Sequence, residues 1–357
     1  MSSNDYSADG AVASRRGAGW HAAQPRALVL GPVVLANPVA LAPMSGVTDL
    51  PFRRLAQRLG AGLVVSEMVA SEALVTERRD VLRRITGREL RPFAVQIAGR
   101  EARWMSEGAR IAADMGAEVV DINMGCPAKE VTGKLSGSAL MREPDHALSL
   151  IEAVVGAVSV PVTLKMRLGW DRNCLNAPDI ARRAEAAGVR LVTVHGRTRS
   201  DFFKGSADWH AVRAVADAVP VPVIVNGDIT SPVEAVTALE QSGADGVMVG
   251  RGAYGAPWLP GRIAATLAKG RDPGPPDLEQ QRDIATEHVT AMLEHYGREL
   301  GLRNARKHIG WYLESAGLRG ERLKGWRRRL CTDDVAERVL EGLADAYEDA
   351  GMGEAAA

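Results

Sequence analysis

Short, continuous apolar runs recur along most of this 357-residue chain. The runs are rich in Val, Ile and Leu, and they begin near Val39, Leu63, Phe93, Val119, Val162, Leu191, Val223 and Gly246. Continuous apolarity, unlike alternation, is typical of parallel strands that are covered on both faces. Segments with a helical period of apolar residues separate the runs, as at 51–59 and 177–187. Eight strand–helix units predict an α/β fold, a (β/α)8 TIM barrel, and an open doubly wound sheet is the alternative.

Other segments place the boundaries of this barrel. Two short β runs around Gly31 and Pro32, within 28–35, predict a hairpin that covers the barrel floor. A Gly- and Pro-rich linker at 270–276 ends the repeating pattern. Helical periodicity follows over 280–296, 302–315 and 335–347. We therefore expect a disordered tail over 1–25, a TIM barrel over 26–270 and an all-helical domain over 277–350.

Composition narrows the class of protein. Charged residues make up 25% and hydrophobic residues 46% of the chain, which is typical of a globular protein, and the formal net charge is zero. The three cysteines, Cys126, Cys174 and Cys331, lie far apart, and no His-Glu-x-x-His motif is present. We expect no disulfide framework, no metal site and a reducing cytoplasmic location. No run of 18 apolar residues occurs, so we expect no membrane span. As a separate expectation, we predict a monomer.

Charge divides sharply within the C-terminal region. Residues 303–330 contain nine Lys or Arg and two Glu, a net charge of +7, whereas residues 332–357 contain eight acidic residues and one Arg, a net charge of −7. A solvated helix face is one explanation for the basic block. A surface for a phosphate backbone is the other, because Trp311, Tyr312 and Trp326 are interleaved with the cations.

Polar residues and glycines follow every predicted barrel strand. In a barrel of this type the carboxyl ends of the strands meet at one mouth, where active sites lie. The segments at these ends are 42–46, 66–68, Gln96, 123–126, 165–167, 195–197, 226–228 and 250–252. Burying so many polar groups costs several kcal/mol unless they are paired, so packing alone does not account for them.

The last two strand ends suggest a phosphate site. Asn226-Gly227-Asp228 and Gly250-Arg251-Gly252 offer backbone N–H groups and one guanidinium, in the two loops where barrels commonly bind phosphate. Residues 250–255 also match Gly-x-Gly-x-x-Gly. This match follows the eighth strand and not the first, so we reject a dinucleotide-binding fold.

Cys126 and two further residues suggest flavin chemistry. The thiol follows a buried strand and precedes Pro127, which is how a reactive side chain is held at a barrel mouth, although a buried structural cysteine is the commoner case. Gln96 can hydrogen-bond the uracil-like edge of a flavin mononucleotide (FMN) ring, and Lys165 can lie near the negative charge of the reduced ring.

These segments together resemble the tRNA-dihydrouridine synthases, in particular the bacterial B-type group. The resemblance extends over about 28–330 and depends on Ala-Pro-Met-Ser-Gly at 42–46, Ser-Glu-Met at 66–68, Gln96, Asp-Ile-Asn-Met-Gly-Cys-Pro at 121–127, Leu-Lys-Met-Arg at 164–167, Val-His-Gly-Arg-Thr-Arg at 194–199, Lys-Gly-Ser-Ala-Asp-Trp at 204–209, Asn-Gly-Asp at 226–228 and Val-Gly-Arg at 249–251.

The resemblance implies an FMN enzyme that uses NADPH, or NADH, to reduce the C5=C6 bond of a uridine in the D loop of tRNA. It implies that Cys126 is the general acid and that Asn123 and Arg197 face the uracil. It also implies a set of FMN contacts: Pro43, Met44, Ser45, Gln96, Lys165, His195, Asn226, Gly227, Asp228, Gly250 and Arg251.

The expected chemistry transfers hydride from flavin N5 to uracil C6, and Cys126 protonates C5 from the opposite face. The base must leave its stack to reach a barrel mouth, and the helical domain would hold the tRNA through its basic block. Two alternatives stay open: an FMN barrel of the dihydroorotate dehydrogenase type, and an RNA-binding scaffold or chaperone without activity.

Overall fold

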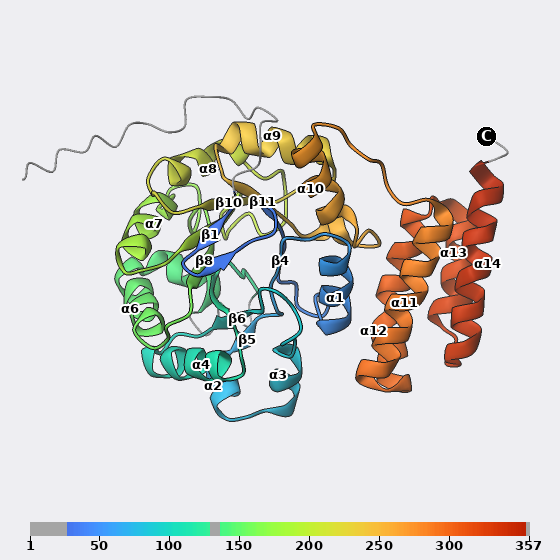
Figure 1. Cartoon of the computed structure of the whole chain (residues 1–357), viewed down its shortest axis with the longest axis horizontal. Helices are drawn as coiled ribbons and strands as arrows, with labels where there is room; N and C mark the ends of the chain where they lie inside the picture. Colours follow the sequence, from blue (N-terminus) through green and yellow to red (C-terminus); the bar gives the residue numbers. More distant parts are fainter. Residues whose placement is uncertain (1–26, 129–135, 355–357) are drawn as a thin grey trace, which may run out of the picture.

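The computed structural model of the chain describes residues 27–128 and 136–354. The predicted disordered tail lies outside these residues. Figure 1 shows a ring of helices around a barrel of strands, with a bundle of C-terminal helices packed against one side. Helix α14 (Ala336–Glu354), the last described helix, lies on the side of this bundle away from the barrel.

All eight predicted barrel strands are present and parallel. They are β3 (Val39–Leu41), β4 (Leu63–Val64), β6 (Ala94–Ala98), β7 (Val119–Met124), β8 (Val162–Arg167), β9 (Leu191–His195), β10 (Val223–Asn226) and β11 (Gly246–Val249). A short additional strand, β5 (Val69–Ala70), pairs with β6 at one edge of the sheet. A parallel bridge between Val65 and Ala94 joins the end of β4 to β6 and closes the ring. The (β/α)8 prediction is therefore confirmed.

Helices connect the strands in sequence order. The helical elements of the barrel are α1 (Leu50–Arg58), α2 (Ser71–Val75), α3 (Arg79–Arg84), α4 (Ala102–Asp114), η1 (Gly137–Arg142), α6 (Pro144–Val155), α7 (Ala177–Ala186), α8 (Trp209–Ala216), α9 (Pro232–Ser242), η2 (Arg251–Ala253) and α10 (Leu259–Lys269). Local sequence fixes several of their ends. Ser231 caps α9 by accepting from the backbone N–H of Glu234, Pro232 starts the helix, and Gly243 ends it with a φ of 61°.

A hairpin covers the barrel floor as predicted. Strands β1 (Val29–Leu30) and β2 (Val33–Val34) pair antiparallel. Leu28, Leu30 and Leu35 are buried in one cluster with residues near the strand starts, among them Leu63 and Val119. Because apolar side chains fill this end of the barrel, the polar groups are confined to the opposite end.

The C-terminal bundle consists of α11 (Leu278–Tyr296), α12 (Arg298–Ser315), α13 (Gly320–Cys331) and α14 (Ala336–Glu354). A capping box between Asp277 and Gln280 starts α11. Three of these helices match the predicted helical segments. The sequence did not single out α13 because it carries most of the basic block and has Leu330 as its buried side chain.

The bundle packs firmly on the barrel. Leu55 of α1 and Trp258 before α10 belong to the apolar core of the bundle. Phe52 of α1 is fully buried against two bundle histidines, with ring-centroid distances of 5.3 Å to His288 and 5.6 Å to His308. Figure 1 shows α1 facing α11 and α12, and the α1–α11 pair is in direct contact.

Candidate active site

The predicted site residues meet at the carboxyl ends of the strands. Asn123 pairs with Lys165 across β7 and β8. Next, Arg167 pairs with His195 across β8 and β9, and His195 pairs with Asn226 across β9 and β10. Parallel pairing in register thus brings five predicted side chains, far apart in the sequence, to one mouth.

A hydrogen-bonded turn holds Cys126 at this mouth. The side-chain oxygen of Asn123 accepts from the backbone N–H of Gly125 at 3.2 Å and of Cys126 at 3.0 Å. The carbonyl of Cys126 accepts from the Ser138 hydroxyl at 2.9 Å. The thiol itself is partly exposed and forms no disulfide. Asn123 therefore serves first to fix the cysteine turn.

A buried carboxylate below Cys126 escaped the sequence prediction. Asp121 accepts from Gln96 Nε2 at 2.7 Å and from Thr163 Oγ1 at 2.6 Å. The amide oxygen of Gln96 accepts from Asn123 Nδ2 at 2.8 Å, so the network reaches the cysteine turn. Burial raises the pKa of Asp121. The signal in the sequence was a carboxylate within an otherwise apolar strand.

Lys165 connects the carboxyl ends of β8 and β10. Its ammonium donates to Asn226 Oδ1 at 3.1 Å, and Asn226 Nδ2 donates to the carbonyl of Met248 at 2.8 Å. Desolvation lowers the pKa of Lys165 to about 8, and the nearby charge of Arg167 acts in the same direction. Asp121 and Cys126 oppose this shift. The ammonium is thus mostly charged at neutral pH, and a bound anion would raise its pKa.

Arg167 supports the cysteine turn from the next strand. It is 1% exposed, and its Nε donates to the carbonyl of Gly125 at 2.8 Å. Its Nη1 donates to the carbonyls of Thr198 and Phe202, both at 2.7 Å. The guanidinium therefore ties the loop after β7 to the loop after β9.

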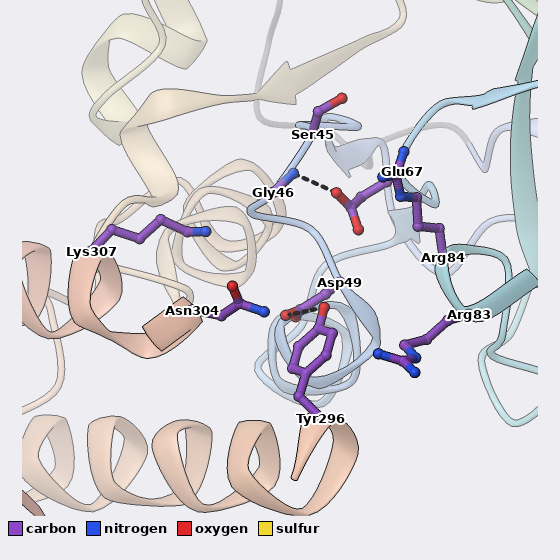
Figure 2. Close-up of a pocket in the computed structure, with 9 residues that line it drawn as sticks. All are labelled: Ser45, Gly46, Asp49, Glu67, Arg83, Arg84, Tyr296, Asn304 and Lys307. Atoms are coloured by element: carbon purple, nitrogen blue, oxygen red, sulfur yellow. Dashed lines mark hydrogen bonds between the residues drawn. The ribbon is translucent and has the colours of Figure 1, made fainter. Parts of the chain in front are cut away.

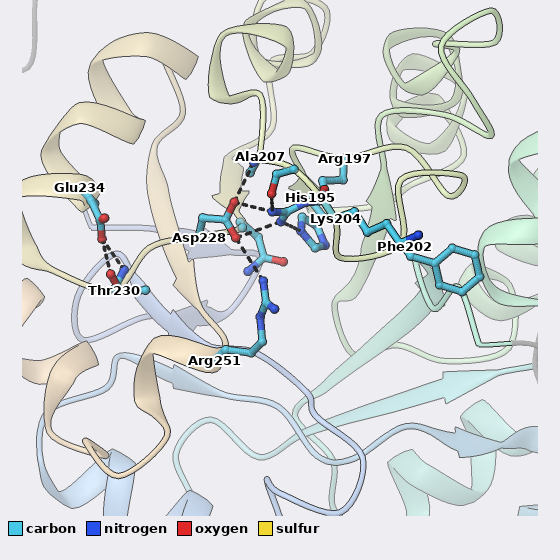
Figure 3. A network of polar contacts seen from close by, with 12 residues as sticks. His195, Arg197, Phe202, Lys204, Ala207, Asp228, Thr230, Glu234 and Arg251 are labelled. Atoms are coloured by element: carbon cyan, nitrogen blue, oxygen red, sulfur yellow. Dashed lines mark hydrogen bonds and ion pairs between the residues drawn. The ribbon is translucent and has the colours of Figure 1, made fainter. Parts of the chain in front are cut away.

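Arg197 and Asp228 form the centre of a second network (Figure 3). The guanidinium of Arg197 binds both carboxylate oxygens of Asp228, at 3.0 and 2.5 Å. Its other N–H groups donate to the carbonyls of Lys204 and Gly205. All five N–H groups have protein partners, since Nη1 also lies 3.2 Å from His195 Nε2. A contact between Arg197 and uracil stays a prediction, and it would require one of these bonds to be exchanged.

Asp228 organises the predicted phosphate side. Besides Arg197, its carboxylate pairs with Arg251 at 3.2 Å and accepts from the backbone N–H of Ala207 at 2.7 Å. Burial alone would raise the pKa of Asp228, but these hydrogen bonds and the two guanidinium charges hold it below its usual value. Because a carboxylate repels phosphate, Asp228 can help a phosphate only through its backbone N–H and by aiming Arg251.

Backbone shape leaves room for a ligand on this side. Gly227 has a φ of 115°, and a Cβ there would stand 2.7 Å from the His195 ring. At Gly250 a Cβ would approach Met44, which places the loop of Pro43, Met44 and Ser45 beside the last strand end. A glycine is therefore required at 227, where the loop approaches the His195 ring closely, whereas a Cβ at 250 would make only an ordinary contact at 3.8 Å.

His195 is neutral in this environment. It is 9% exposed, and burial together with the charges of Lys165, Arg167, Arg197 and Arg251 lowers its pKa well below the usual value. A neutral imidazole offers one donor and one acceptor at the mouth.

The basic block of the bundle is largely ion-paired. Arg322 pairs with Asp349, Arg329 with Asp345 and Arg306 with Asp334. Within the block, Arg327 pairs with Glu314 and Lys324 with Glu321. Arg328 is exposed and has no ion pair among the described residues. The basic and acidic halves of the sequence thus neutralise each other, and the predicted phosphate surface is smaller than the charge count suggested.

Two searches of the described part of the chain were negative. Between 27 and 354, with 129–135 left aside, no helix is long and apolar enough for a membrane span. The same residues contain no group of three metal-ligating side chains.

Comparison with known proteins gives consistent results. A family model described as "Dihydrouridine synthase (Dus)" matches residues 40–348. A Rhodobacter capsulatus protein named "Probable tRNA-dihydrouridine synthase" is 61% identical over 308 residues, which cover 85% of this chain and 93% of that protein. A Pseudomonas putida protein named "tRNA-dihydrouridine synthase B" is 48% identical over 288 residues, which cover 80% of this chain and 86% of that protein.

A solved structure supports the fold alone. The structure of histamine dehydrogenase from Rhizobium sp. 4-9 aligns with a TM-score of 0.54 at 14% sequence identity, over 74% of this chain and 50% of that chain. The shared part corresponds to a barrel fold, and at this identity the likeness says nothing about the reaction.

Proposed function

Because the chain belongs to the dihydrouridine synthase family, we propose that it reduces the C5=C6 bond of a D-loop uridine in tRNA, with FMN as cofactor and NADPH as reductant. One observation supports this proposal most: the partly exposed Cys126, the desolvated Lys165 and the two glycine-containing loops after β10 and β11 lie at the same end of the barrel. A proton donor, a charge for the reduced ring and an anchor for its phosphate are what the reaction requires.

The residues at the mouth fit FMN. Arg251 has a side chain that is 52% exposed, and it lies beside the glycines of both loops that would bind the phosphate. Lys165 would lie near the pyrimidine end of the ring, and Gln96 keeps one amide hydrogen beyond its bond to Asp121. Bound FMN, reduced by NADPH, supplies the hydride for C6 of uracil.

Cys126 would give its proton to C5. The bonds from Asn123 and Ser138 fix the backbone of Cys126, and the residue is partly exposed. Asn123 has one amide hydrogen left for a carbonyl of the base. The target uridine must leave its stack to reach these groups.

The bundle would hold the rest of the tRNA. Cations that lack an internal partner, such as Arg328, are the ones available for backbone phosphates. Affinity for tRNA should then decrease steeply as salt concentration increases.

The direct test supplies purified protein with FMN, NADPH and an unmodified tRNA transcript, and then measures dihydrouridine by mass spectrometry of the digested RNA. We expect dihydrouridine in the D loop, and none in a transcript whose D-loop uridines are replaced by cytidine. A flavin-loaded protein that leaves tRNA unchanged but oxidises dihydroorotate would favour the other type of flavin barrel. A protein that does not take up FMN would contradict the cofactor assignment.

A further inference from the structure

A pocket lies between the barrel and the bundle, beside the mouth (Figure 2). Its volume is about 240 Å³. The loop after β3 forms one wall, α3 a second, and α11 and α12 a third. The lining residues are Ser45, Gly46, Asp49, Glu67, Arg83, Arg84, Tyr296, Asn304 and Lys307.

Cations without ionic partners face this space. Figure 2 shows Asn304 and Lys307 extending from α12 toward the loop of Gly46, with Arg83 on the opposite side. A Cβ at Gly46 would be 3.6 Å from the Lys307 ammonium. Among the described residues, neither Lys307 nor Arg83 has a carboxylate within ion-pair distance, and the guanidinium of Arg83 instead lies over the ring of Tyr296 at 5.8 Å.

The two carboxylates of the pocket are already engaged by its wall. Asp49 accepts from the backbone N–H of Phe52 and from the Tyr296 hydroxyl, both at 3.0 Å. Glu67 accepts from the backbone N–H of Gly46. Burial raises the pKa of Asp49 to about 6, so this carboxylate takes up a proton more readily than a free one. The polar groups still available to a ligand are therefore mainly donors, which suit an anion.

The position of the pocket connects it with the reaction. Ser45 and Gly46 follow Pro43 and Met44 directly, so a ligand in the pocket would lie one loop away from the proposed flavin site. The other wall belongs to the bundle that would hold tRNA. A group bound here is thus a neighbour of the reacting base or of the reductant.

We propose that this junction pocket binds a phosphate group of a nucleotide, held by Lys307, Arg83 and the amide of Asn304. The inference depends on the proposed function, since that function supplies two such phosphates at the mouth. One is a backbone phosphate of the RNA next to the flipped uridine. The other is the ribose phosphate that distinguishes NADPH from NADH.

The test compares Lys307→Gln and Arg83→Gln with Lys269→Gln as matched control. Lys269 ends α10, so in a barrel it lies on the face opposite the strand ends. FMN absorbance and the thermal midpoint of each protein verify folding. Binding of labelled tRNA at several salt concentrations forms one arm, and the rate of flavin reduction by NADPH and by NADH forms the other.

If the pocket binds an RNA phosphate, Lys307→Gln should weaken tRNA binding by about tenfold at low salt. The slope of log affinity against log salt should then decrease in magnitude by about one. A reductant phosphate predicts instead that the preference for NADPH over NADH decreases by about tenfold, with tRNA binding unchanged. Arg83→Gln should follow in the same arm, and Lys269→Gln should change neither.

Two results separate failure of the inference from failure of the proposed function. If the unsubstituted protein forms dihydrouridine but both pocket variants behave like Lys269→Gln in both arms, the pocket is not a phosphate site. If the unsubstituted protein forms no dihydrouridine, the proposed function is wrong, yet a loss of tRNA affinity in Lys307→Gln would still support the pocket.

Discussion

The barrel mouth and the basic block are the two regions of this protein where charged residues concentrate, and the structure treats them differently. At the mouth, Lys165, Arg167, Arg197 and Asp228 are buried or half-buried and fixed by hydrogen bonds. In the basic block the charges lie on exposed helices and mostly pair with acidic residues of the bundle. Position along a strand therefore predicted which polar side chains come together, whereas the sum of charges along a helix did not predict how many of those charges are free of ion pairs.

The largest expected effect lies at the mouth. Cys126→Ala should lower the rate of uridine reduction by at least about 100-fold, because loss of a general acid typically costs that much or more. FMN content should stay unchanged, since the thiol is not among the proposed cofactor contacts. The assay measures dihydrouridine formed per minute in saturating tRNA, with Cys174→Ala as the matched control. Full activity in Cys126→Ala would contradict the proposed role of this thiol as general acid.

Topology explains why the mouth was predictable. The eight apolar runs and the polar residues that follow them determine which residues share a face, because parallel strands point the same way. Asp121 was missed because it lies inside a strand, where the pattern suggested only packing. The structural roles of Arg167 and Arg197 were missed because they bond backbone carbonyls in loops and, for Arg197, also the carboxylate of Asp228, and no sequence pattern indicates those contacts.

The bundle was harder to predict, because helix α13 and the ion pairs of the bundle depend on contacts between residues far apart in the sequence. Helix α13 has only a narrow buried face, so its period is weak, and the pairing of α13 with α14 depends on tertiary packing. The pairs Arg322–Asp349 and Arg329–Asp345 join residues that the sequence separates into a basic and an acidic block. Nothing local indicated that these blocks would face each other.

The second prediction concerns the brace at the mouth. Arg197→Met would leave the carboxylate of Asp228 with only Arg251 and one backbone N–H, so we expect the free energy of unfolding to decrease by about 3 kcal/mol. Urea denaturation measures this loss, and FMN affinity should fall with it because Asp228, the partner of Arg251, loses the guanidinium that holds it in place. Arg199→Met, which removes a cation stacked on Trp170 without an ion pair among the described residues, is the comparison. A variant of Arg197 that stays fully stable but has a raised KM for tRNA would favour contact with uracil instead.

The third prediction concerns His288, which lies where the bundle packs on the barrel. Burial lowers the pKa of His288 to about 3, with a smaller contribution from Lys307, so the folded protein keeps this ring neutral. An unfolded histidine takes up a proton near pH 6.5, so the contribution of His288 to stability is complete above that pH. It is lost as the pH falls from 6.5 toward 3. At pH 5 the loss should reach about 2 kcal/mol.

Urea unfolding at pH 7.5 and pH 5 measures this loss. His288→Gln should weaken the pH dependence by that amount, whatever its effect on stability at pH 7.5. Asp49 acts in the opposite direction, because its pKa is raised to about 6, and it is present in both proteins. An equal pH dependence in the two proteins would show that His288 does not carry the acid sensitivity.

The smallest expected effect concerns the basic block, and it decides whether that block is a binding surface at all. Arg328→Ala removes an exposed cation that has no ion pair within 27–128 and 136–354, so tRNA affinity should decrease by about threefold and the salt slope by about one.

Asp345→Asn is the converse change, because it releases Arg329 from its carboxylate partner. If the block faces tRNA, this variant should bind about two- to threefold more tightly at low salt, since a surface ion pair is weak and its cation is then free for a phosphate. A block that only solvates the helix predicts no change in either variant. The pair of substitutions thus tests a gain and a loss at the same surface, and only a phosphate-binding role accounts for both.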